Sequence, residues 1–152
     1  MFSLVYDEVR HVLVGFAAPG PRTDADYERV LAAVAKLDRD GKAANKPTAF
    51  VLVVDTNSER PPPKWRRRLA EQRSELTSPR VLMAIVSPSA LTRGVITAMN
   101  WVSPPPAHVQ MVNHATIEEA ALWVERLQDT PRATVQRMFE EARGRASTAR
   151  SA

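Results

Sequence analysis

Residues Ala49–Val54 read AFVLVV, an unbroken apolar run that is followed directly by Asp55. Valine and phenylalanine favour strands, and a strand without polar alternation is typical of a sheet that is buried on both faces. A second run of this kind, VLMAIV, occupies Val81–Val86. Helical patterns lie between and around these strands, so the sequence predicts a largely parallel sheet with right-handed crossovers.

The chain before Ala49 predicts a hairpin and one helix. Phe2–Tyr6 and His11–Phe16 are rich in strand-forming residues around a polar connection, which is typical of an antiparallel hairpin. Thr23 stands at a helix N-cap position after a Pro-Gly-Pro break. An apolar face with helical spacing follows it, formed by Tyr27, Val30, Leu31, Val34 and Leu37.

The chain after Asp55 alternates helices and strands. The predicted elements are a helix over Lys64–Leu76 opened by three prolines, the strand Val81–Val86, a helix over Leu91–Val102, a strand over His108–Val112 and a helix that ends near Leu127. Thr116 and Glu119 form a capping box before this last helix. A further helical stretch follows Pro131, and the apolar periodicity ends at Arg143.

These elements predict an α/β fold with a mixed four- or five-stranded sheet. An N-terminal antiparallel hairpin forms one edge, helices cover the sheet, and one additional helix lies at the C-terminus. We expect the α/β domain to span residues 1–128, a helical extension to span 129–143, and a disordered tail to span 144–152.

Composition limits the class of protein. The 152 residues are 44% hydrophobic and 25% charged and include no cysteine, which excludes thiol catalysis, iron–sulfur clusters and thiolate zinc sites. No basic segment followed by an apolar stretch opens the chain, and no apolar run approaches the roughly 20 residues of a membrane helix. We therefore expect a soluble, cytoplasmic protein that does not span a membrane.

The net charge of +4 is concentrated in one segment. Residues 60–80 carry seven basic and two acidic side chains. Trp65, Leu69 and Leu76 mark the buried stripe of this predicted helix, so its basic residues should be solvated. They form the candidate interaction patch: Lys64, Arg66, Arg67, Arg68 and Arg73. The interleaved aromatic residues of a base-stacking surface are absent, and we expect no specific nucleic-acid binding.

No catalytic constellation is visible. His11, His108 and His114 lack metal-ligand spacing, and the five glycines are too scattered for a phosphate-binding loop. Asp55 is expected to cap the turn after its strand. Trp101 and Trp123 lie next to helical apolar faces, which predicts packing against the sheet. We expect neither an enzyme nor a cofactor.

Three features together resemble the STAS-like family. They are the helix opened by Thr23–Tyr27 after a hairpin, the core strand that ends in Asp55, and the helix carried by Ala115–Val124 after the last strand. The resemblance implies a bacterial, non-catalytic interaction module. Sporulation-type members carry a phosphorylatable serine after the core strand, which makes Thr56 and Ser58 candidate phosphoacceptors by position. The family's serine-pair motif is missing from this segment.

The sequence therefore predicts a non-enzymatic regulatory or scaffolding module that binds another protein. The alternative is a module that binds anions or lipid, through the basic helix or through an apolar pocket between helices. The identity of the partner and the oligomeric state are left open at this point.

Overall fold

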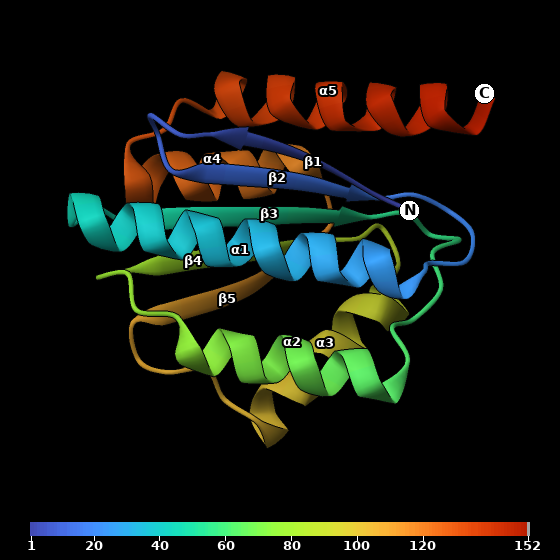
Figure 1. Cartoon of the computed structure of the whole chain (residues 1–152), viewed down its shortest axis with the longest axis horizontal. Coiled ribbons are helices and arrows are strands. Elements are labelled where there is room, and N and C mark those ends of the chain that lie inside the picture. The colour runs from blue at the N-terminus through green and yellow to red at the C-terminus, as the bar shows by residue number, and fades with distance from the viewer. Residues whose placement is uncertain (152) are drawn as a thin grey trace.

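The computed structural model describes residues 1–151 and contains one five-stranded mixed sheet. The strands are β1 (Phe2–Asp7), β2 (Val12–Ala17), β3 (Thr48–Val54), β4 (Val81–Val86) and β5 (Val109–His114), and they lie side by side in sequence order. β1 and β2 form the expected antiparallel hairpin, and every other neighbouring pair is parallel. The predicted α/β fold is confirmed (Figure 1).

Each of the three parallel pairs is joined by a crossover that contains a helix. These helices are α1 (Asp24–Ala44), α2 (Pro63–Glu75) and α3 (Ala90–Val102). All three crossovers start at the carboxyl ends of β2, β3 and β4, so the loops after these strands lie at one edge of the sheet. Thr23 caps α1 as predicted, because its hydroxyl accepts the N–H of Asp26.

One face of the sheet packs against α1 and α2 (Figure 1). Tyr27, Leu37 and their neighbours on α1 bury the predicted apolar stripe against Leu13 and Phe50 of the sheet. Trp65 of α2 is 2% exposed and stacks on Tyr27 at 5.0 Å between ring centroids. The prediction that Trp65 is a core residue is confirmed.

The opposite face is covered by α4 (Ile117–Gln128) and α5 (Arg132–Ser151). Thr116 caps α4 through the N–H of Glu119, as expected. The Glu119 carboxylate, however, accepts the N–H of Ala115 rather than that of Thr116. The capping box therefore reaches one residue further back than the sequence pattern predicts.

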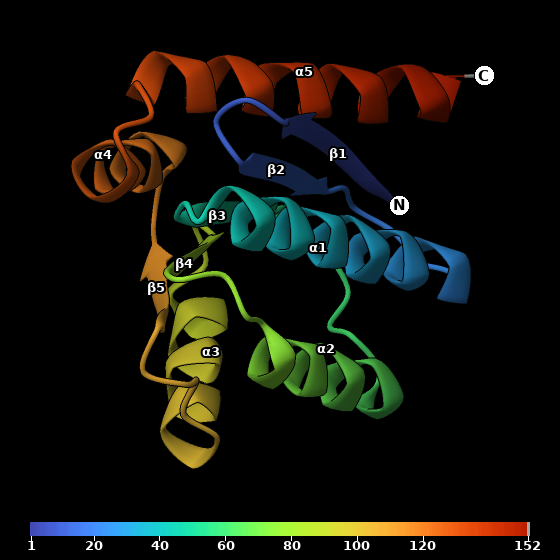
Figure 2. The same ribbon diagram turned by 60° about the vertical axis from the view of Figure 1, so that its left-hand side comes forward.

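The expectation of a disordered tail over 144–152 is wrong for the residues that the structure describes. α5 continues to Ser151 and crosses β1 and β2 (Figure 2). Ala146 is fully buried, and Arg145 donates to the carbonyl of Leu4 at 3.0 Å. Ala146 continues the buried stripe of Phe139 and Ala142 by one more turn, and its small side chain lets the helix lie close to the hairpin. Ala152, the end of the predicted tail, lies outside the described residues.

α5 is part of the domain core rather than a separate extension after residue 128. Val135, Met138 and Phe139 belong to the same buried cluster as Val124 of α4 and Val14 of the sheet. Among residues 1–151, no helix is both long enough and apolar enough to cross a bilayer.

Candidate interaction surface

The predicted basic patch is divided by the structure into paired and free residues. Lys64 of α2 pairs with Asp24 at 3.0 Å, and Arg68 pairs with Glu28, so both cations bind acidic residues of α1. Both also lie over the ring of Trp65, at 4.8 and 5.1 Å from its centroid. These two side chains hold α2 against α1 and are not free for a partner.

Arg73 differs most from the prediction, because it is partly buried and its guanidinium is bound within the chain. Its guanidinium donates to Asn100 Oδ1 at 3.0 Å and to the carbonyl of Ser103 at 2.7 Å, and it contacts the Met111 sulfur at 3.2 Å. Burial lowers the pKa of Arg73 below its ordinary value. Arg73 therefore joins α2 to the end of α3 and to β5, and does not belong to an interaction patch.

Arg66 and Arg67 are exposed as well, but they differ from Lys64 and Arg68 in their lack of a partner. Neither has a hydrogen bond or ion pair with any residue in the part of the chain that the structure describes. The five-residue patch expected from the sequence thus reduces to two adjacent arginines.

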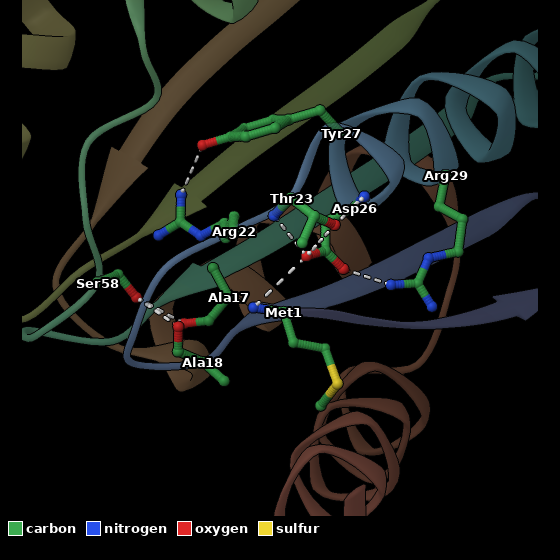
Figure 3. Close-up of polar contacts among 9 residues, drawn as sticks. All are labelled: Met1, Ala17, Ala18, Arg22, Thr23, Asp26, Tyr27, Arg29 and Ser58. Atoms are coloured by element: carbon green, nitrogen blue, oxygen red, sulfur yellow. Dashed lines mark hydrogen bonds and ion pairs between the residues drawn. The ribbon is translucent and has the colours of Figure 1, made fainter. Parts of the chain in front are cut away.

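The two candidate phosphoacceptors lie in different environments after β3. The Ser58 hydroxyl points inward and donates to the carbonyls of Ala17 and Ala18, at 2.7 and 3.3 Å (Figure 3). Thr56 is exposed, and its nearest polar contact is Asp55 Oδ1 at 3.5 Å. Asp55 accepts the N–H of Asn57 at 3.0 Å, which is the turn-capping role expected for it. Only Thr56 presents its hydroxyl to solvent.

A compact ionic cluster closes the N-terminal end of α1 (Figure 3). The Asp26 carboxylate accepts the backbone N–H and hydroxyl of Thr23, pairs with Arg29, and lies 4.0 Å from the Met1 ammonium. Burial works to raise the pKa of Asp26, but the hydrogen bonds from Thr23 and the nearby cations outweigh it, so the pKa is lowered. All of these groups bind one another, and the cluster is structural.

The three histidines are far apart in the fold and have separate neighbours. His11 lies in the turn between β1 and β2, and His108 Nε2 lies 2.7 Å from the carbonyl of Leu76. His114 packs against Trp123 at 5.7 Å between centroids, and burial lowers its pKa. No group of three or more histidine or acidic residues that could hold a metal occurs within residues 1–151.

α3 is the element whose surface departs most from the prediction. Leu91, Val95, Ala98 and Val102 lie on one side of the helix, as the spacing indicates, but this side faces solvent. Trp101 was expected to pack on the sheet, yet it is 81% exposed, and Val102 is 88% exposed. None of the thirteen residues of α3, all of which are described, is buried.

The opposite, polar side of α3 faces the body of the molecule. Asn113 of β5 donates to Thr97 Oγ1 at 2.9 Å and to the carbonyl of Arg93 at 3.2 Å. Arg93 donates to the carbonyl of Ser87 at 2.6 Å, and Asn100 accepts from Arg73. α3 is therefore attached through hydrogen bonds, and its apolar stripe points away from the domain.

This outward stripe and the neighbouring strand form the candidate site, which we call the α3–β5 surface. It comprises Leu91, Met99, Trp101 and Val102 of α3 and the open edge of β5, whose Val112 is exposed on the opposite face of the sheet, on the side of α4. These are five of the six large hydrophobic residues that are exposed in the described chain. A shallow hollow of about 400 Å³ lies along α3, lined by Val95, Ala98, Met99, Val102 and Ser103. Several exposed apolar side chains along one helix are typical of an interaction site.

The spacing of Leu91, Val95, Ala98, Met99 and Val102 predicts one apolar face for this helix, but not the direction in which that face points. One signal was available: the polar residues Arg93, Thr97 and Asn100 also share a face, at positions i, i+4 and i+7. Comparison of the chain with known protein families, curated proteins and solved structures gives no significant match.

Proposed function

We propose that this protein is a non-catalytic interaction module whose docking site is the α3–β5 surface. The observation that carries the proposal is the orientation of α3, which turns its polar residues toward the domain and its apolar residues toward solvent. A monomer gains nothing from an exposed apolar stripe, because each exposed apolar side chain forgoes about 1.5–3 kcal/mol of burial. A partner that covers the stripe recovers this free energy.

The kind of side chain at the site supports a protein partner. Tryptophan and methionine are enriched at protein interfaces, and a buried tryptophan is a frequent hot spot. Trp101 lies at the end of α3 that is farthest from the sheet, where a partner can reach it (Figure 2). The proposal includes membership of the STAS-like family, because members of that family act as interaction modules. It also includes a cytoplasmic location.

Photo-cross-linking in living cells tests the proposal. A photoreactive phenylalanine analogue replaces Trp101 in one variant and Val9 in another; both side chains are 81% exposed, but Val9 lies in the hairpin turn, away from the site. We expect a discrete protein adduct from position 101 and none from position 9. Equal labelling at both positions, or none at position 101, would contradict the proposal.

The alternative function, binding of anions or anionic lipid, is supported by one observation. Arg66 and Arg67 are exposed side by side and make no ion pair with the described residues. Binding of this type weakens steeply with salt and needs no apolar contact. Sedimentation with anionic vesicles at low and high salt tests it, and the alternative fails if binding is equal in the Arg66→Gln/Arg67→Gln variant.

A further inference from the structure

We infer that the partner at the α3–β5 surface is a second copy of this chain. In the dimer, the β5 strands of two copies pair in antiparallel fashion around a twofold axis at Val112, so that the two Val112 residues lie opposite each other, and the two α3 helices pack together over the junction. This inference rests on the proposed function, because it names the occupant of the proposed docking site.

β5 is an open edge strand. Within residues 1–151, β5 pairs with β4 on one side and with no strand on the other. The carbonyls of His108 and His114 accept N–H groups from the β4 segment, so the alternate backbone groups of Met111 and Asn113 face outward. β5 contains no lysine, acidic residue or proline, the usual devices that prevent edge pairing.

α3 lies directly beside the open edge of the sheet. The hydrogen bond between Asn113 and Thr97 holds α3 directly beside β5, and Figure 2 shows both at the same end of the sheet. Asn100 turns toward Arg73 of α2, so the apolar residues on the other side of the helix point away from α2. The surface therefore combines unpaired backbone groups with an apolar stripe.

The charged residues near α3 and β5 do not oppose the approach of a second copy. No acidic residue occurs between Glu75 and Glu118, and Arg93, the one charged residue of α3, is bound to the carbonyl of Ser87. Arg73 and Arg80 also reach β5, where Arg73 binds Asn100 and the carbonyl of Ser103 and Arg80 binds Gln110, so the cations next to this surface already have partners in their own chain. Arg66 and Arg67, which would repel a second copy, lie on α2 outside the surface.

These features favour a second copy over a membrane. A bilayer could accept Trp101 and Val102, but its hydrocarbon offers no hydrogen bonds to the strand edge. A second copy satisfies both the edge and the stripe.

Sedimentation equilibrium of the purified full chain is the first measurement. We expect twice the mass of one chain at micromolar concentration. Trp101→Asp and Val112→Lys should each raise the dissociation constant more than tenfold, since one removes the anchor and the other places like charges across the strand pair. Val9→Lys is the matched exposed control and should leave the mass unchanged. Circular dichroism confirms that every variant is folded.

Mixing two charge variants tests the strand pairing itself. Val112→Lys and Val112→Glu should each be monomeric alone and form a heterodimer when combined, because opposite charges attract across antiparallel strands. Native mass spectrometry distinguishes the two chains. A folded mixture that stays monomeric would overturn the pairing of β5 with β5.

The remaining outcomes separate this inference from the proposed function. A monomeric purified chain whose Trp101 adduct in cells contains another protein would overturn the second copy and leave the docking site standing. A monomer that binds anionic vesicles and loses this binding in Trp101→Asp would replace the second copy by a membrane. A monomer without any adduct would remove both the inference and the proposed function.

Discussion

Gly41 of α1 and Gly94 of α3 should respond in opposite ways to replacement by alanine. A Cβ on Gly41 of α1 would lie 2.1 Å from Thr48 Cγ2 and 2.9 Å from Ser78 Oγ, whereas a Cβ on Gly94 of α3 would meet nothing within 4 Å. Gly41→Ala should therefore lower the free energy of unfolding by about 1–3 kcal/mol through overpacking. Gly94→Ala should raise it by up to about 1 kcal/mol through helix propensity. Urea titration measures both, and equal effects would contradict the close approach at Gly41.

Asp38 provides a second prediction for a single residue. Its carboxylate accepts the N–H groups of Thr77 and Ser78 at 2.8–3.0 Å and the Thr77 hydroxyl at 3.0 Å. Burial works to raise the pKa of Asp38, but these hydrogen bonds outweigh it, and the pKa is lowered from 3.8. The stabilisation is therefore fully present above the unfolded-state pKa and is lost as the pH falls through the folded-state pKa.

Asp38→Asn tests this linkage. The variant should unfold more easily at pH 7 by about 1–3 kcal/mol, because an amide oxygen accepts these hydrogen bonds more weakly than a carboxylate does. The difference from the wild type should shrink as the pH falls below about 4. Urea titrations across this pH range measure it, and a difference that does not depend on pH would mean that the charge of Asp38 contributes nothing.

At the scale of elements, α2 is attached to its neighbours by some of its basic residues and leaves others free. Arg73→Gln should destabilise the fold by about 1–3 kcal/mol, because Asn100 and the carbonyl of Ser103 lose a half-buried charged donor. The double variant Arg66→Gln/Arg67→Gln should change stability by less than about 1 kcal/mol per residue. Thermal melting compares them, and a larger loss in the double variant would show that Arg66 or Arg67 is paired.

The last turns of α5 provide another prediction at this scale. A chain that ends after Arg143 loses Ala146, which is fully buried, and the bond from Arg145 to Leu4. We expect its melting midpoint to fall by several degrees, since about 1 kcal/mol corresponds to a few degrees in a domain of this size. A chain that ends after Thr148 keeps both contacts and is the control. Equal midpoints for all three chains would show that the end of α5 adds no stability.

For the whole molecule, self-association couples stability to concentration. A partner that binds only the folded state stabilises it by mass action, so the melting midpoint of the wild type should rise with protein concentration. Trp101→Asp removes the anchor of the proposed interface, and its midpoint should not depend on concentration. Scanning calorimetry over a dilution series measures both. A wild-type midpoint that is constant over the series would contradict a dimer of folded chains.

Local patterns were sufficient to predict most elements and their order. The apolar runs at Ala49–Val54 and Val81–Val86 became the two inner parallel strands β3 and β4, and the helical periodicity from Tyr27 to Leu37 became the buried face of α1. These features are set by short-range spacing, which determines whether side chains repeat on one face of a helix or on both faces of a strand. Trp65 could be assigned to the core for the same reason.

The direction of α3, the pairing of Arg73 and the docking of α5 were decided only by the tertiary structure. A periodic pattern tells which residues share a face, but not which neighbour covers that face. The sheet ends at β5, so α3 has hydrogen-bonding partners on its polar side and no described element over its apolar side. α5 has a weak apolar pattern, yet the hairpin supplies a surface on which even Ala146 is buried. All three outcomes depend on contacts between segments that are distant in the chain, and local spacing does not determine which segments meet.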